Sequence, residues 1–201
     1  MTLLREAVGL MEEAIHGSGC EDGAVTLRRD PDAPRCQFER GASLEASFGG
    51  RTAHVVTGSP VQTETRLSSL FDRDLPEPEL RTAALGILSA VAGFLCLARR
   101  VHACDPACHG PCLKELGDEI RGRGIFTPVD IPVLSRDLAP LSSGGAGGAE
   151  ILVIAGETLI REEELGDLRD LAMGRGMLLL GPSTSGVASL LSLPHWCPYG
   201  R

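Results

Sequence analysis

The chain has 201 residues, 43% of them hydrophobic, with a net charge of −8 and a pI near 5.1. It is long enough for one medium domain or two small ones with a buried core, and its acidic balance argues against a nucleic-acid partner, because binding to phosphate backbones needs clustered Lys and Arg. Seven cysteines, three of them within nine residues, do not fit the paired disulfides of a small secreted domain, so we expect a globular protein of the reducing cytoplasm.

The first part of the chain predicts a helix and an antiparallel hairpin. Apolar residues between positions 3 and 15 recur at helical spacing, and this segment lacks the basic start and apolar block of a signal peptide. Farther along, apolar and polar residues alternate on both sides of Gly49 and Gly50, which supply a two-residue turn tolerant of positive φ. His54 lies on the opposite face of its strand from Val55, where we expect a solvent-facing side chain, with a minor ligand role as the alternative.

A long apolar helix is predicted after a polar connection over residues 59–75. Pro78 suits the first turn of a helix, and residues 82–98 carry no charge between Arg81 and Arg99. This stretch of 17 residues is at the short edge of what can span a bilayer, and its many Ala and Gly residues weaken it further. We therefore predict a buried helix at the centre of the core rather than a membrane span.

The segment from Cys104 to Cys112 carries the clearest chemical signal. It places Cys104, Cys108, His109 and Cys112 within nine residues, and soft thiolate and imidazole ligands suit zinc, an iron-sulfur centre or another soft metal. The spacing matches neither a zinc knuckle nor the usual ferredoxin run. Two alternatives are open. The cysteines pack as small hydrophobes, or Cys112 is a thiol of lowered pKa in the first turn of a predicted helix over residues 111–121.

The C-terminal half predicts a parallel sheet. Residues 151–155 and 177–180 are continuous apolar runs on either side of a helical pattern over residues 162–173, as expected for strands buried on two faces. The turns that follow the two strands then lie at the same edge of the sheet, where ligands of open α/β sheets bind. The Gly-rich run over residues 142–148 lacks the Lys-Ser/Thr ending of a phosphate-binding loop and is predicted to be a flexible loop.

Two polar turns at that edge form the candidate ligand site. The first holds Gly156 and Thr158, and the second, Gly181-Pro182-Ser183-Thr184, leads into a short helix over residues 187–193. A hydroxyl-rich loop before a helix offers amides and oxygens to an anion, although Ser and Thr also cap helices. The tail after residue 193 holds the only Trp and the only Tyr. Either it packs over the sheet edge, or His195 or Cys197 completes the metal coordination.

Residues 150–160 read Glu-Ile-Leu-Val-Ile-Ala-Gly-Glu-Thr-Leu-Ile, and after an acidic helix residues 177–184 read Met-Leu-Leu-Leu-Gly-Pro-Ser-Thr. Together they resemble the carboxyl-terminal domain of the heavy-metal chelation family, and the apolar helix from Leu80 is similar too. The resemblance implies an enolase-N-terminal-like domain of a helix with antiparallel strands, joined to an atypical Rossmann-like domain, with a ligand cleft between them and metal or metallocofactor handling. It carries over to Thr158 and to the positions from Gly181 to Thr184. The first Rossmann-like strand and its glycine turn are reduced to residues 123–128, so no nicotinamide or flavin cofactor is predicted.

We therefore expect an α/β fold in two parts. Residues 1–75 would form a small N-terminal α+β part with an antiparallel hairpin, and residues 76–201 a helical spine with an atypical, truncated Rossmann-like parallel sheet. The predicted function is the binding of a soft metal ion or a metal-containing small molecule in the cleft between the parts. Ser183 and Thr184 would orient an anionic group of that molecule. The metal ligands would be the following side chains: Cys104, Cys108 and Cys112, with His109 or Cys197 as the fourth.

Two other functions fit the sequence. An enzyme would use Cys112 or Cys197 as nucleophile and Glu157 or His195 as base, acting on a small anionic substrate held by the second polar turn. A structural or subunit protein would use the apolar helix over residues 82–98 as a homo-oligomer interface, and its cysteines would be inert.

Overall fold

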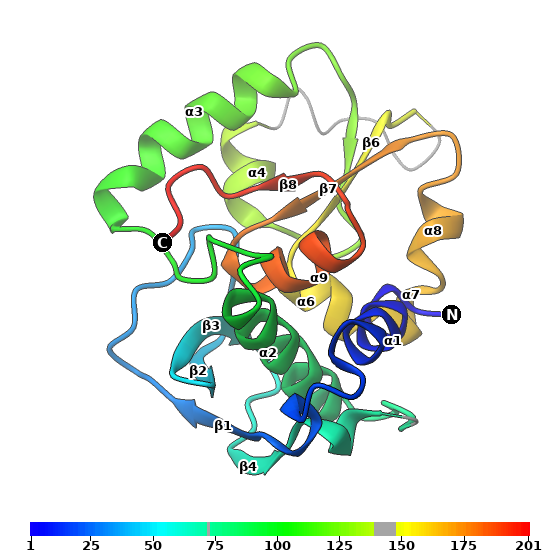
Figure 1. Cartoon of the computed structure of the whole chain (residues 1–201). Coiled ribbons are helices and arrows are strands. Elements are labelled where there is room, and N and C mark those ends of the chain that lie inside the picture. Colours follow the sequence, from blue (N-terminus) through cyan, green and yellow to red (C-terminus); the bar gives the residue numbers. More distant parts are fainter. Residues whose placement is uncertain (72, 139–147) are drawn as a thin grey trace.

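The computed structural model describes residues 1–71, 73–138 and 148–201. The fold contains two four-stranded sheets, one antiparallel and one parallel, with helices packed around them (Figure 1). The antiparallel sheet has the order β3-β2-β1-β4 and consists of β1 (Ala24–Arg29), β2 (Ala42–Phe48), β3 (Arg51–Thr57) and β4 (Thr63–Arg66). The parallel sheet follows chain order through β5 (Ile125–Phe126), β6 (Ile151–Ile154), β7 (Gly176–Leu180) and β8 (His195–Trp196). The predicted α/β class is confirmed. The Gly-rich loop predicted over residues 142–148 lies outside the described residues except at its last position.

The predicted hairpin is formed by β2 and β3. Ala46 pairs with Ala53 across the two strands. The turn residues Gly49 and Gly50 have φ angles of 56° and 77°, a conformation that glycine adopts without strain and that a two-residue hairpin turn of this type requires.

His54 is buried, which corrects the expectation of a solvent-facing side chain. Only 8% of its surface is exposed, because the chain before α3 (His109–Glu119) runs along the edge of β3. The His54 amide donates to the Val101 carbonyl at 2.8 Å, and the His102 ring stands edge-on to the His54 ring with centroids 4.5 Å apart. The C-terminus lies beside the same segment (Figure 1), where the Arg201 amide donates to the His102 carbonyl at 3.0 Å.

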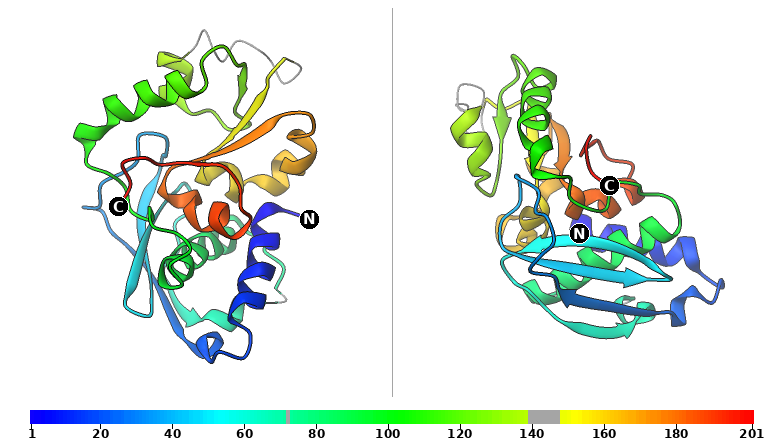
Figure 2. Two further views of the ribbon diagram at one scale, coloured as in Figure 1. Left: turned by 45° about the horizontal axis from the view of Figure 1, so that its top comes forward. Right: turned by 90° about the vertical axis from the view of Figure 1, so that its left-hand side faces the viewer.

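The long apolar helix α2 (Pro78–Phe94) lies at the centre of the fold. Figure 2 shows it over one face of the antiparallel sheet, and it contacts α1 (Leu3–Ile15), α6 (Gly156–Ile160) and α9 (Ser185–Leu190) on its other sides. Residues 81–92 are all buried within the chain, which explains why apolar residues predominate after Thr82 and makes this part of the helix unavailable as a subunit interface. Among the described helices, none is long and apolar enough to cross a membrane.

One apolar cluster extends from α1 through the antiparallel sheet and α2 to β6 and β7, so the boundary predicted at residue 75 lies within a continuous core. A buried carboxylate adds a polar link across it. The Leu3 amide donates to both carboxylate oxygens of Glu162, at 2.9 and 3.1 Å. Glu162 is fully buried, and burial raises its pKa to about 7.

The helix predicted over residues 162–173 is wrong in extent. The segment instead forms two short helices, α7 (Glu162–Leu165) and α8 (Leu168–Leu171). Gly166 ends α7 with a φ angle of 90°, and the Asp167 side chain accepts the Arg169 amide at 2.8 Å to begin α8. The breaks place Glu162 at the start of a helix, where it can reach the Leu3 amide.

Candidate functional site

Four buried free cysteines from three separate regions of the chain, two of them in the segment around the start of α3, line one small cavity. They come from the β1–β2 connection, the chain before α3, the first turn of α3 and the tail after β8: Cys36, Cys104, Cys112 and Cys197. The cavity has a volume of about 10 Å³, and His109, Trp196 and Tyr199 also line it. We call this group of side chains the thiol pocket.

The thiol pocket brings together most of the predicted metal-binding residues. Cys104, His109, Cys112 and Cys197 all line it, whereas Cys108 does not. Cys36 was missed by sequence reasoning. It reaches the pocket because the Gln37 side-chain amide donates to the His109 carbonyl at 2.7 Å, which fastens the β1–β2 connection to the start of α3.

The pocket thiols are poor nucleophiles. Burial raises the pKa of Cys36 and of Cys104, and it raises that of Cys197 to about 12, with neighbouring acidic groups adding to the effect. Cys112 was considered as a thiol of lowered pKa, but burial raises its pKa too, and the nearby Trp196 indole and Gln37 amide offset this only in part. The neutral thiols give no support to the reactive-cysteine enzyme.

The sulfur and nitrogen atoms of the thiol pocket lie farther apart than the ligand atoms of a site that holds a metal ion. Zinc–thiolate bonds of about 2.3 Å bring tetrahedral sulfur ligands within roughly 4 Å of one another, but among these described side chains no three ligand atoms lie within 4.8 Å of one another. The His109 Nε2 atom is buried and has no hydrogen-bond partner among the described residues. A metal ion could be held there only after side-chain rotations that bring the ligand atoms closer together.

The polar groups of the second turn form hydrogen bonds within the chain, which corrects the prediction that they bind an anion. The Ser183 amide donates to Glu39 Oε1 at 3.1 Å, and the Ser183 hydroxyl accepts the Val56 amide at 3.0 Å. The Thr184 hydroxyl donates to the carbonyls of Leu180 and Gly181. Ser183 and Thr184 are fully buried, so they join the two sheets instead of facing an anionic ligand.

Of the remaining ligand candidates, Thr158 lies on a larger cleft, whereas Gly181 and Pro182 line the thiol pocket. A cavity of about 480 Å³ opens between the end of β3 and the carboxyl end of β6, with these residues on its wall: Phe38, Glu39, Arg40, Gly41, Val56, Gly58, Pro128, Val129, Asp130, Ile131, Ala155, Glu157, Thr158 and Arg161. Thr158 was predicted and does line it. Gly156 does not, and a Cβ added there would lie 2.8 Å from the Ser183 Cβ.

Two buried polar atoms on the wall of this cleft lack a partner. The Thr158 hydroxyl and Glu39 Oε2 have no hydrogen-bond partner among the described residues. Burial raises the Glu39 pKa to about 7, and hydrogen bonds from Ser183 limit the rise. Gly181 lies against both Glu39 and Cys36, since a Cβ added to it would approach their side chains at 2.7 and 3.3 Å. Glu39 therefore borders the cleft on one side and the thiol pocket on the other.

The tail packs over the edge of the parallel sheet, which was the first of its two predicted roles. Residues 195–196 form β8, which pairs with β7. Of the two candidate ligands in the tail, Cys197 lines the thiol pocket, but His195 lies apart from it. Its Nε2 atom is 2.9 Å from the Gly181 carbonyl oxygen, and burial lowers its pKa.

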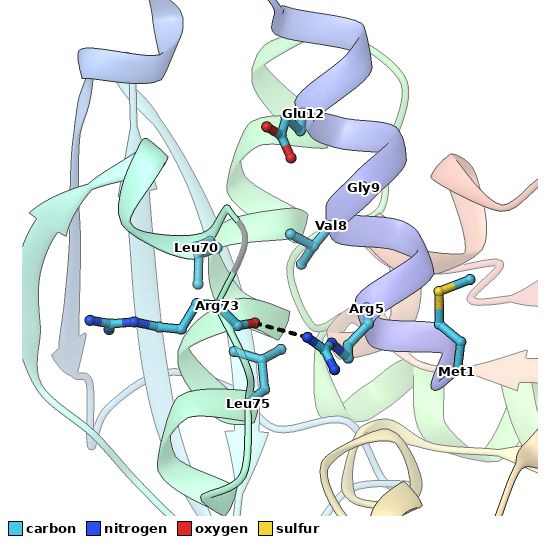
Figure 3. A pocket seen from close by; sticks show the side chains of 8 residues that line it. All are labelled: Met1, Arg5, Val8, Gly9, Glu12, Leu70, Arg73 and Leu75. Atoms are coloured by element: carbon cyan, nitrogen blue, oxygen red, sulfur yellow. Dashed lines mark hydrogen bonds between the residues drawn. The ribbon is translucent and has the colours of Figure 1, made fainter.

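A further hollow of about 420 Å³ lies along α1 (Figure 3). Arg5 crosses it, and its guanidinium donates to the Arg73 carbonyl at 3.5 Å and to Asp74 at 2.6 Å. Because this cation is already paired and Val8, Leu70 and Leu75 supply apolar walls, we assign the hollow no chemical role.

Comparison with known proteins gives no relative: no family model matches the chain, and no curated protein or solved structure matches it either. The function must therefore be argued from the thiol pocket and the cleft.

Proposed function

We propose that the protein binds a soft metal ion in the thiol pocket, and that the adjoining cleft accepts the organic part when the ion is carried by a small molecule. One observation carries the proposal. Cys36, Cys104, Cys112 and Cys197, from three separate regions of the chain, surround a cavity of about 10 Å³. That volume holds roughly one water-sized sphere, which favours a single ion over an iron-sulfur cluster. Thiolates select soft or borderline ions such as Cu⁺ and Zn²⁺.

The charges around the pocket suit a cation. Glu39 is close enough to raise the pKa of both Cys36 and Cys197. Without an ion, burial first and the nearby Glu39 second keep these two thiols protonated. An arriving ion would displace those protons, so binding should weaken as the pH falls.

The cleft extends the proposal to a metal-containing small molecule. Its volume of about 480 Å³ is in the usual range of small-molecule sites. The Thr158 hydroxyl and the free oxygen of Glu39 are buried in its wall without a partner, and they would serve a ligand only where its binding opens the wall slightly. The resemblance to the heavy-metal chelation family, which rests on the motif residues alone, agrees with a ligand in this position.

A cadmium titration of reduced, metal-free protein tests the thiol site. We expect one Cd²⁺ per chain with thiolate-to-metal ultraviolet absorption. Cys36→Ser should weaken binding at least about 10-fold, because it removes a ligand and leaves a poorer donor. Cys96→Ser is the matched control, since Cys96 is exposed and lies outside the pocket. Equal affinities of the two variants, or wild-type protein without the thiolate absorption, would contradict the proposal.

A further inference from the structure

We propose a second metal site, for a divalent ion that prefers oxygen and nitrogen ligands, formed by Asp30, Glu45 and His54. Each of these residues offers one ligand atom, and the three atoms lie within 4.8 Å of one another. Within the described parts of the chain, no other group of three His, Cys, Asp or Glu side chains meets that distance. The site is separate from the thiol pocket and does not rest on the function proposed for it.

Strand register brings the three residues together. Glu45 on β2 is directly opposite His54 on β3, so both side chains project from the same face of the sheet. Asp30 follows the last residue of β1, and its amide donates to the Ser43 carbonyl at 3.0 Å. Ser43 is two residues from Glu45, so its side chain also lies on this face. The opposite face packs against α2, as the contacts around Gly86 show.

Unpartnered buried atoms mark the group as more than a pair of acidic side chains. His54 is 8% exposed and Ser43 is 2% exposed. Neither His54 Nδ1 nor Ser43 Oγ has a hydrogen-bond partner among the described residues. A buried polar atom left without a partner destabilises the folded state. A cation with its bound water would supply a partner for the ring nitrogen and for the hydroxyl.

The charges also favour a cation. Asp30 and Glu45 are half-buried, and neither forms an ion pair with a basic side chain in the described residues. The His102 ring packs edge-on against the His54 ring, with centroids 4.5 Å apart, and so helps to hold the imidazole in place. His102 is itself held by Thr52, whose hydroxyl lies 2.9 Å from His102 Nε2.

The ligand types distinguish this site from the thiol pocket. Two carboxylates and one imidazole suit Zn²⁺, Mn²⁺, Fe²⁺ or Co²⁺, whereas Cu⁺ and Cd²⁺ prefer thiolates. Two carboxylates carry two negative charges, which balance a divalent ion. With three protein ligands, water would complete the coordination.

Cobalt titration tests this site, because the visible and near-ultraviolet spectrum of Co²⁺ reports whether its ligands are thiolates or oxygen and nitrogen atoms. We expect wild-type protein to bind one Co²⁺ with a weak spectrum of the oxygen/nitrogen type, in addition to any Co²⁺ whose thiolate absorption reports the thiol pocket. Cys36→Ser should keep this ion. Mn²⁺ at substoichiometric amounts should broaden the NMR signals of the His54 ring before those of His16.

Glu45→Gln should weaken the oxygen/nitrogen-type binding at least about 10-fold, because it removes one charge and one ligand while keeping the shape of the side chain. Glu64→Gln on β4 is the control, since it makes the same charge change at an exposed position of the same sheet. Equal binding by the two variants would overturn the assignment. A spectrum of thiolate type alone, lost in Cys36→Ser, would also overturn it while supporting the thiol pocket.

Discussion

Replacing Gly186 with alanine is expected to lower the free energy of unfolding by about 3 kcal/mol, the upper end of typical overpacking penalties. A Cβ at this position would lie 2.6 Å from the Ser89 amide nitrogen and 2.7 Å from the Leu88 carbonyl carbon. Both atoms belong to the backbone of α2, which cannot move aside as a side chain could. Helices α2 and α9 would have to separate, and the turn holding Ser183 would move with α9.

Urea denaturation followed by circular dichroism measures this change. Gly9→Ala in α1 is the control, because a Cβ there would meet no atom within 4 Å. The free energy of unfolding of that variant should instead rise by about 0.5–1 kcal/mol, since alanine is a better helix former than glycine. If Gly186→Ala were as stable as the wild type, the close approach of α2 and α9 would be refuted.

The parts of the fold that were predictable are those in which a short stretch of sequence carries its own pattern. Gly49 and Gly50, between segments of alternating apolar and polar residues, were enough to predict the hairpin. The apolar runs around residues 151 and 178 were enough to predict two parallel strands. The helix predicted over residues 162–173 failed because Gly166 and Asp167 interrupt it, and because Glu162 turns inward to accept the Leu3 amide. Strands β5 and β8 have two residues each, too few to show a period.

The candidate site was predictable only where its residues share a local motif or one short tail. Cys104, His109 and Cys112 are neighbours in sequence, but Cys36 reaches them through a tertiary contact that Gln37 makes. Its position in the long connection between β1 and β2 was the only available signal. Ser183 and Thr184 were wrongly predicted to face a ligand. A hydroxyl-rich turn has the same sequence whether it binds a ligand or, as here, forms hydrogen bonds to the Val56 amide and Glu39.

Stability should fall as the pH rises from about 5 to 8, and Glu39 should account for a large share of this loss. Burial raises the Glu39 pKa from its ordinary 4.5 to about 7. Between these values the folded protein binds a proton that the unfolded chain releases, so folding is favoured at the lower pH and loses that advantage as the pH passes 7. A shift of this size corresponds to on the order of 3 kcal/mol.

Glu39→Gln should therefore flatten the pH dependence of the free energy of unfolding, measured by urea denaturation at pH 5 and pH 8. Glu162→Gln is the informative comparison, because burial raises the Glu162 pKa to about 7 as well. Each variant should remove part of the slope, and wild-type behaviour of Glu39→Gln would show that its carboxylate ionises normally. A cation in the thiol pocket would stabilise the ionised Glu39 beside Cys36 and Cys197. Loading with Cd²⁺ should change the slope in both proteins, because the bound thiols have lost protons that they regain on unfolding. The change should be larger in the wild type than in Glu39→Gln, which links this buried proton to the proposed metal site.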